Sequence, residues 1–545
     1  MQSYFNPADG TPFGAMPLLP DAAAMTRATS TGGEKPVAIV IGSGFGGLAA
    51  AIRLAVRGWQ VQVLEKLDAP GGRAYVWRQD GFSFDAGPTI ITAPFLLDEL
   101  WEVAGRRFAD DVTLKAMDPF YRLRFADGSW FDCSGDPEAM RAEVARIAPE
   151  DLPGYERFLE ESARCYELGF IKLGGIAYNT IGDLLRAVPT MARMRGWRSI
   201  HAMVRGHFSN EKLRVAFSFH PLLIGGNPLA VTCIYSLINT LERRFGVHWA
   251  MGGTGSIIRA MVKLLESLGG QIRYDAEVAR IDVTSAPDSP ARGKGRATGV
   301  TLRNGQTLKS DIVVSNADTM WTYRHLVEPQ WRRRWTDRKI ERSKHSMSLF
   351  VWYFGTNRRW DEVPHHMMVL GPRYDELLRD IFQRHLLADD FSLYLHRPSA
   401  SDPSVAPAGC DTFYVLSPVP HLDSGTDWAR EAPRYRQAVA EVLEATVLPG
   451  LRKHIVTERM TTPQDFQDRL LSYQGAAFGQ EPLLLQSAWF RSHNRSEDVE
   501  GLYMVGAGTH PGAGVPGVLM SARTLEQVLP TPQEAMAARA RRTHG

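Results

Sequence analysis

The sequence predicts an α/β protein in which two domains are interleaved along the chain. Residues 37–65 have the order strand, glycine-rich turn, helix and strand, and residues 501–517 lead through a strand into a second glycine-rich turn. Between these units the pattern changes from mostly helical to mixed strand and helix. With 545 residues and 44% hydrophobic content, the chain is long enough for two or more domains with their own cores.

The first unit, residues 37–65, has the order of a Rossmann-type dinucleotide-binding motif. A β-branched run at 37–41 precedes the turn Gly42-Ser43-Gly44-Phe45-Gly46-Gly47, a helical pattern at 48–57 and an alternating run at 59–64. Unpaired amides at the start of such a helix, together with its dipole, favour a bound diphosphate. The unit therefore predicts a dinucleotide site.

Four residues of this unit have separate predicted roles. Gly42 permits the sharp turn, Gly44 lets the backbone approach the pyrophosphate, and Gly47 lets helix and strand pack closely. Glu65 follows about twenty residues after the glycines, where the motif places an acid that binds a ribose hydroxyl.

Charge and cysteine content exclude other classes of site. The formal net charge is +2 and no basic stripe is interleaved with aromatic residues, so we predict no nucleic-acid partner. The cysteines lie far apart, without metal-ligand spacing, so we expect small buried apolar residues in a reducing compartment and no metal site. They are Cys133, Cys165, Cys233 and Cys410.

Neither of two long uncharged runs predicts a membrane span. Residues 37–52 belong to the glycine motif, and residues 501–522 contain too many glycines and prolines for a continuous lipid-embedded helix. Residues 1–35 lack the basic and apolar regions of a secretory signal and are predicted to be disordered. Met25 is a second candidate for the start of translation.

Two further segments resemble a flavoprotein superfamily. The turn Gly71-Gly72-Arg73-Ala74 and the segment Asp85-Ala86-Gly87-Pro88-Thr89 follow the glycine motif as they do in amine oxidases and carotenoid desaturases. The resemblance implies an FAD-binding domain of the glutathione reductase/amine oxidase-like type. It places Gly72 and Arg73 at the diphosphate, Pro88 and Thr89 near the flavin, and the Val278 backbone near the adenine.

The C-terminal glycine block, residues 501–517, and three shorter segments narrow the resemblance to bacterial phytoene desaturases. The shorter segments are residues 216–221, 225–228 and 486–491, and the resemblance covers residues 36–529. It implies successive insertion of carbon–carbon double bonds into phytoene, to give neurosporene and/or lycopene. Electrons would pass to FAD and then to a quinone or oxygen.

The same resemblance makes the C-terminal block a second part of the cofactor site. Its turn residues would direct backbone amides at FAD. They are Gly506, Gly508, Gly514 and Val515. No cysteine or histidine stands where covalent attachment is expected, so we predict non-covalent FAD.

These patterns together predict how the two domains share the chain. The FAD-binding domain takes residues 36–100, 247–320 and 472–530, and a mixed α+β substrate domain takes residues 101–246 and 321–471. Residues 531–545 form a basic tail. Between residues 285 and 296 a polar loop precedes a hairpin at Asn304-Gly305.

Residues 170–208 are basic and apolar, with five net positive charges. One interpretation is a membrane-facing segment that inserts Trp197 and Met194 between lipid headgroups. The other is a pair of solvated helices over the substrate domain. Together with the resemblance to bacterial phytoene desaturases, the membrane-facing interpretation predicts peripheral contact with the cytoplasmic side of a bacterial inner membrane.

Four residues are candidates for proton transfer. Glu160, Glu161 and Arg164 share a predicted helix and could present a carboxylate and a cation on neighbouring turns; the alternative is a solvated ion-pair face. His220 lies in an apolar segment, where a buried structural histidine is the alternative.

Three other functions remain open at this point. The chain could desaturate a later carotenoid, isomerise a carotenoid without net oxidation, or carry prenylated partners without a flavin. Retention of Gly42, Gly44, Gly47 and Glu65 argues against the last.

Overall fold

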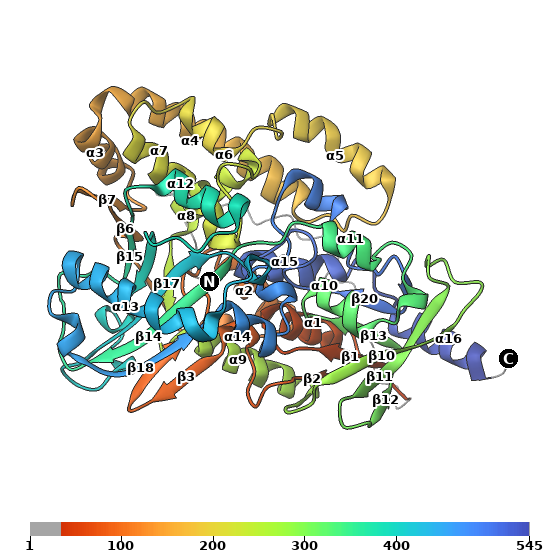
Figure 1. The fold of residues 1–545 in the computed structure, drawn as a ribbon. Helices are drawn as coiled ribbons and strands as arrows, with labels where there is room; N and C mark the ends of the chain where they lie inside the picture. The colour runs from red at the N-terminus through yellow and green to blue at the C-terminus, as the bar shows by residue number, and fades with distance from the viewer. Residues whose placement is uncertain (1–33, 544–545) are drawn as a thin grey trace.

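The computed structural model describes residues 34–543. The disorder predicted for residues 1–35 falls almost entirely outside the described residues. Figure 1 shows a nucleotide-type domain on the right, a large sheet on the left and a layer of helices above both. The described elements form an α/β fold with parallel and antiparallel sheets, in agreement with the fold class predicted from the sequence.

A five-stranded parallel sheet is built from three distant segments of the chain. Its strand order is β20-β13-β1-β2-β9. The strands are β1 (Val37–Ile41), β2 (Gln60–Leu64), β9 (Gln271–Arg273), β13 (Ile312–Ser315) and β20 (Leu502–Met504). These strands fall within the three segments assigned to the FAD-binding domain, although its exact boundaries stay a prediction.

The two faces of this sheet pack against different layers. Ala38 and Val40 face the helices α1 (Phe45–Val56), α9 (Thr254–Ser267) and α15 (Val515–Leu525). Ile39 and Ile41 face a smaller sheet. That sheet contains β10 (Val278–Ser285), β11 (Gly295–Leu302), β12 (Thr307–Lys309) and β19 (Val499–Glu500). The central strand is thus buried on both sides, as expected for a parallel sheet.

The second large sheet has seven strands in the order β18-β14-β17-β16-β15-β6-β7. Its strands are β6 (Tyr121–Arg124), β7 (Trp130–Cys133), β14 (Ser348–Thr356), β15 (His366–Val369), β16 (Leu393–His396), β17 (Asp411–Val419) and β18 (Ile455–Thr461). Alternate residues of β14 separate its faces: Phe350 and Trp352 pack against α13 (Trp428–Thr446), whereas Leu349 and Val351 face a cavity.

The prediction of a mostly helical region at residues 101–246 was incomplete. Strands β6 and β7 belong to the seven-stranded sheet, and β5 (Leu114–Ala116) pairs with β8 (His248–Ala250). The helices of the region lie above the sheets (Figure 1). They are α3 (Pro137–Ile147), α4 (Leu152–Cys165), α5 (Ile181–Arg193), α6 (Ile200–Arg205), α7 (Glu211–Ser218) and α8 (Leu237–Phe245). Helix α2 (Phe95–Glu102) precedes them and packs into the core that contains α1.

Shorter elements connect these layers. They are β3 (Val76–Gln79), β4 (Phe82–Asp85), α10 (Thr319–Trp321), α11 (Asp337–Arg342), α12 (Tyr374–Arg379) and α14 (Pro463–Asp468). The C-terminal tail contains α16 (Pro532–Thr543), whose Arg539 pairs with Asp311. Among the described helices, none combines the length and apolar character that crossing a bilayer requires.

Candidate active site

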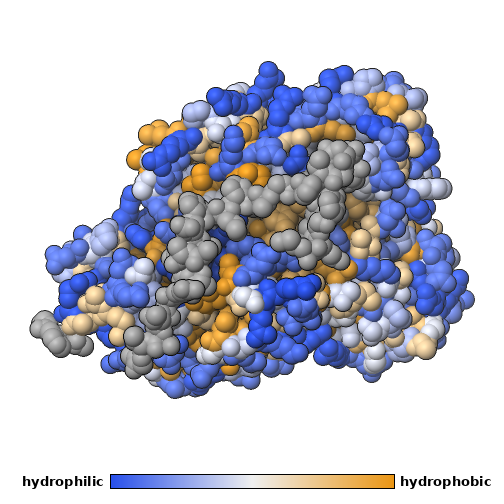
Figure 2. Space-filling model, turned by 180° about the vertical axis from the view of Figure 1, so that it is seen from behind, coloured by the Kyte–Doolittle hydropathy of each residue, from blue (hydrophilic) through white to orange (hydrophobic). Residues whose placement is uncertain are grey.

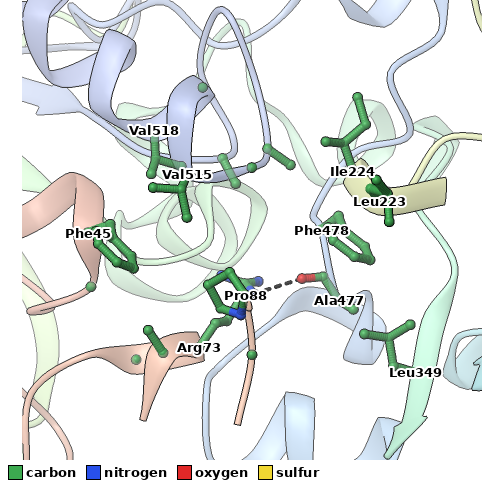
Figure 3. Close-up of a pocket in the computed structure, with 18 of the residues that line it drawn as sticks. Phe45, Arg73, Pro88, Leu223, Ile224, Leu349, Ala477, Phe478, Val515 and Val518 are labelled. Carbon is green, nitrogen blue, oxygen red and sulfur yellow. Dashed lines mark hydrogen bonds between the residues drawn. The ribbon is translucent and has the colours of Figure 1, made fainter. Parts of the chain in front are cut away.

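One continuous cavity of about 490 Å³ runs between the two domains. At one end it is lined by the glycine turn and by Glu65, and at the other by apolar residues of the seven-stranded sheet. Figure 3 shows its middle, where Phe45, Val515 and Val518 lie opposite Leu223, Ile224 and Phe478, with Arg73 and Pro88 between them. A nucleotide and a hydrocarbon can therefore meet in a single space.

The glycine turn presents unpaired amides to the cavity. Gly42 adopts a φ of 88° and its amide donates to the Leu64 carbonyl at 2.8 Å, which closes the turn onto β2. Gly44 is the N-cap of α1 and supplies no side-chain cap, so the first amides of the helix remain free to bind a ligand. Gly42, Gly44, Phe45 and Gly46 all line the cavity. This cradle fits a diphosphate.

Three of the predicted cofactor residues have packing roles and do not line the cavity. A Cβ at Gly47 would lie 2.0 Å from the Gly42 carbonyl oxygen. A Cβ at Gly506 would lie 2.6 Å from Asn316 Oδ1, and one at Gly508 would lie 1.8 Å from Thr319 Oγ1. These glycines let the turns approach their neighbours; any direct contact with a cofactor stays a prediction.

Glu65 is a buried carboxylate with a fixed orientation. The Ser43 amide and hydroxyl donate to its Oε2 at 2.8 and 2.6 Å, and the Leu67 amide donates to Oε1 at 2.9 Å. Since each carboxylate oxygen accepts more than one hydrogen bond, the edge that lines the cavity can still accept from a ribose hydroxyl.

Arg73 crosses the middle of the cavity from the short helix η1 (Gly72–Ala74). Its Nε donates to the Ala477 carbonyl at 2.7 Å (Figure 3), and a second guanidinium nitrogen donates to Ser472 Oγ at 2.8 Å. Burial lowers the pKa of Arg73, and the Asp318 carboxylate opposes that shift. The arginine thus holds the nucleotide domain to the segment around residue 477.

The segment from Asp85 to Thr89 links the cavity to the start of α9. Asp85 is buried and accepts from the Thr254 and Gly255 amides at 3.2 and 3.3 Å. Thr89 Oγ1 contacts the Tyr394 and Tyr414 hydroxyls at 2.9 and 3.1 Å. Pro88 and Thr89 line the cavity, as do Gly72, Val278, Gly514 and Val515. Their contact with a flavin stays a prediction.

Asp85 predicts a specific dependence of stability on pH. Burial raises its pKa from 3.8 to about 6, against the lowering effect of the two amides. The folded chain therefore holds this proton more tightly than the unfolded chain, and the associated stability is lost as the pH rises through about 6. Asp85→Asn should become more stable than the wild type by up to about 3 kcal/mol as the pH rises from about 4 to about 7.5.

Urea unfolding at both pH values measures this difference. Asp288→Asn, at an exposed carboxylate, is the control and should follow the wild type. Parallel stability curves for Asp85→Asn and the wild type would contradict the raised pKa.

A buried polar cluster lies beside the apolar end of the cavity. The Tyr121 hydroxyl donates to Glu242 Oε2 at 2.6 Å and lies 2.7 Å from His220 Nε2. His220 Nε2 is 3.3 Å from the same carboxylate oxygen, and Asn239 lies 3.4 Å from His220 Nδ1. Burial, followed by the Glu242 charge, raises the pKa of Tyr121.

Glu242 is the functional candidate that the sequence analysis missed. It lines the cavity, whereas His220 lies behind it. Its Oε1 is buried and has no hydrogen-bond partner among the residues that the structure describes. The sequence feature that could have identified Glu242 is a carboxylate on the otherwise buried face of α8, beside the cavity-lining Ile238 and Leu241.

Glu160 and Arg164 do not reach the cavity. They form an exposed ion pair at 3.4 Å on α4, with 71% and 70% of their side chains accessible. The interpretation as a solvated face describes them, so we assign them no catalytic role. Glu161 instead pairs with Arg198 and with His207.

The apolar wall comes from the short helix η5 (His220–Ile224), helix α8 and the seven-stranded sheet. Of the lining residues that these elements contribute, Glu242 alone is charged. The remainder includes Leu222, Leu223, Ile224, Ile238, Leu241, Leu349, Val351, Met368, Leu393 and Leu416. Such a wall suits a long hydrocarbon with no polar group.

This chain is similar in sequence to known flavoproteins. A family profile described as "Flavin containing amine oxidoreductase" matches residues 45–525. A neurosporene-forming phytoene desaturase of Cereibacter sphaeroides is 50% identical over 503 residues, which cover 91% of this chain and 95% of that protein. A lycopene-forming phytoene desaturase of a Paracoccus species is 47% identical, with coverage of 90% and 97%.

Solved structures share the fold at low sequence identity. Cyclohexylamine oxidase from Brevibacterium oxydans superposes with a TM-score of 0.55 at 15% identity, over 94% of this chain and all of that one. An oxidoreductase from Methanosarcina mazei gives a TM-score of 0.58 at 17% identity, over 90% of this chain and all of that one.

Proposed function

The chain belongs to the flavin-containing amine oxidoreductase family, and within that family we propose that it is an FAD-dependent phytoene desaturase. It is an oxidoreductase that acts on carbon–carbon single bonds. The observation that carries this conclusion is the single cavity in which a dinucleotide cradle opens into an apolar wall. Its relatives include both neurosporene-forming and lycopene-forming phytoene desaturases.

The cofactor is FAD, and the residues of the cavity fit it. The free amides at the start of α1 would hold the diphosphate, Glu65 would hold a ribose hydroxyl, and the Val278 backbone would lie at the adenine. The turn before α15 would place the amides of Gly514 and Val515 near the ring. When bound, FAD supplies the acceptor for the hydride removed from the hydrocarbon.

Binding of the hydrocarbon depends on excluded water and shape. The β14–β17 part of the wall offers aliphatic side chains and two tyrosines, Tyr394 and Tyr414, whose hydroxyls bond to Thr89. Their hydroxyl groups are thus satisfied within the protein. The wall can orient a substrate that has no polar group of its own.

We assign the proton released in each dehydrogenation to Glu242. Loss of a hydride from one carbon must be matched by loss of a proton from its neighbour, and Glu242 is the carboxylate on the apolar wall. Tyr121 donates to Oε2 and fixes the carboxylate plane, which leaves Oε1 for the proton. His220 keeps a role as a positioning residue through its contacts with Tyr121 and Glu242.

Product analysis tests the function. Purified protein, FAD and a quinone are added to phytoene in liposomes, and product masses are followed with time. Successive loss of hydrogen pairs supports the desaturase, and the end product distinguishes neurosporene from lycopene. Inertness towards phytoene with activity on a later carotenoid would contradict phytoene as the substrate. Omitting the quinone in air tests oxygen as the electron acceptor.

We propose a peripheral contact with the cytoplasmic side of the inner membrane, and the exposed surface of helix α5 supports contact with a membrane. Ile181, Leu185 and Val188 form an exposed stripe, with 62%, 64% and 51% of their surfaces accessible, and Trp197 is 66% exposed. Figure 2 shows hydrophobic residues gathered at the upper left, where α5 lies. The sequence prediction that Met194 also inserts was wrong, because Met194 packs into the cluster beneath the helix.

The neighbourhood of this stripe adds positive charge and lies close to the cavity. Arg193 and Arg195 are exposed beside it and suit anionic headgroups. The π-helical segment η4 (Tyr166–Leu173) lies just before α5 in the chain, and its Gly169 and Phe170 line the cavity. A substrate taken from the bilayer would have a short path to the apolar wall.

We expect the double variant Leu185→Glu/Trp197→Glu to lose membrane binding. Each buried apolar side chain contributes about 1.5–3 kcal/mol, so co-sedimentation with anionic liposomes should weaken at least about tenfold at low salt. FAD content should not change. The matched control is Leu386→Glu/Val456→Glu, at two other exposed apolar positions. Equal losses in both variants would contradict a specific membrane face.

A further inference from the structure

Three histidines converge inside the seven-stranded sheet. His366 begins β15 and His396 ends β16, and the two stand directly opposite each other in the antiparallel register. His365 lies immediately before β15. All three are buried, and one nitrogen of each lies within 4.8 Å of the other two.

The hydrogen bonds of the cluster leave nitrogens without partners. His365 Nε2 and His396 Nε2 face each other at 3.1 Å, and His366 Nδ1 bonds to the Tyr394 hydroxyl at 2.6 Å. His366 Nε2 and His365 Nδ1 are buried and have no partner within the part of the chain that the structure describes. Unpartnered buried nitrogens are destabilising, and a bound cation can satisfy them.

The cationic side chains nearest to the cluster are Lys115 and Arg397. The Arg397 charge is itself paired with Asp411 and Asp361, each at 2.8 Å. A neutral imidazole has a free lone pair for a metal ion.

The Trp249 ring packs against one side of the cluster. It packs against His365 and His396 with ring centroids 4.9 and 5.1 Å away, and its Nε1 donates to Asp402 at 3.3 Å. This packing fixes the two imidazole planes. The Tyr394 hydroxyl fixes the third, in the way that outer hydrogen bonds orient histidine ligands of metals.

We propose that His365, His366 and His396 bind one zinc ion. Three imidazoles form a known zinc ligand set, and a fourth position is commonly taken by water. The ion would make His366 a rigid support for Tyr394, which lines the cavity and also contacts Thr89. The site would therefore hold the cavity wall in place without contacting the substrate. It lies outside the cofactor and substrate functions assigned above.

Metal content tests the proposal on the full-length, FAD-loaded protein. The protein is produced without a polyhistidine tag in zinc-supplemented medium and analysed by inductively coupled plasma mass spectrometry. We expect about one zinc per chain. His396→Gln should lose the zinc and keep its FAD, whereas the control His454→Gln, whose imidazole bonds to Asn357 away from the cluster, should keep both.

A second measurement on the wild type does not depend on how a variant folds. Zinc-edge X-ray absorption should show imidazole nitrogens at about 2.0–2.1 Å. Zinc below about one-tenth per chain, copper in its place, or scattering from sulfur would overturn the proposal. So would a soluble, FAD-containing His396→Gln protein that keeps its zinc.

Discussion

Gly44→Val should purify as a folded protein that has lost most of its FAD. Gly44 has a φ of −71°, so its backbone tolerates a side chain, and the added Cβ would lie 3.1 Å from Asn316 Nδ2. Because Gly44 lines the cavity at the start of α1, the valine methyl groups would occupy the space needed for the diphosphate. We expect FAD affinity to fall at least about tenfold, or about 1.4 kcal/mol.

Flavin absorbance per chain and FAD titration measure this loss. Gly44→Ala should give a smaller effect. Gly175→Val is the control, because no atom lies within 4 Å of a Cβ there. Normal flavin content in Gly44→Val would refute the placement of the diphosphate at this turn.

Glu242→Gln should bind FAD normally and lose most of its desaturase activity. Glutamine has the shape of glutamate and still accepts the Tyr121 hydrogen bond, but it takes up no proton. Loss of a general base commonly lowers the rate by about 10²–10⁴-fold, and we expect kcat to fall within that range.

The readouts for Glu242 are kcat on phytoene in liposomes, flavin content and thermal stability. Glu266→Gln, at an exposed glutamate of α9, should match the wild type in all three. Activity of Glu242→Gln within about twofold of the wild type would remove Glu242 from the reaction.

Local patterns were sufficient for the nucleotide domain. The run from β1 to β2 is one contiguous unit, and its turn, helix and acid are fixed by neighbours in sequence. The predicted helix began at residue 48, whereas α1 begins at Phe45. The last residues of the predicted turn already have helical geometry.

Pairing between distant segments explains what the sequence did not reveal. Strand β6 forms a local hairpin with β7 around Asp127-Gly128, a turn signal that was missed, whereas its other partner, β15, lies far along the chain. Glu242 meets Tyr121 and His220 only because α8, β6 and η5 pack together. The histidine cluster likewise depends on the cross-strand pair His366–His396. The sequence analysis, which considered spacing along the chain, predicted no metal site.

Helical spacing also cannot show which face of a helix turns inward. Glu160 and Arg164 were correctly placed on one helix, but that face of α4 points to solvent. Ser162 on the same helix is buried instead and bonds to the Ser236 carbonyl and Thr240 hydroxyl. The choice of face is made by α8 and the neighbouring segment, which the spacing of α4 does not encode.

The most direct test of the account is a single turnover without oxygen or quinone. FAD-loaded protein is mixed with phytoene in liposomes, and the visible band of the oxidised flavin and the carotenoid mass are followed together. For a desaturase, we expect the flavin band to disappear while one hydrogen pair is lost from phytoene for each flavin. An unchanged flavin band with an altered carotenoid isomer composition would contradict it and would identify a redox-neutral isomerase.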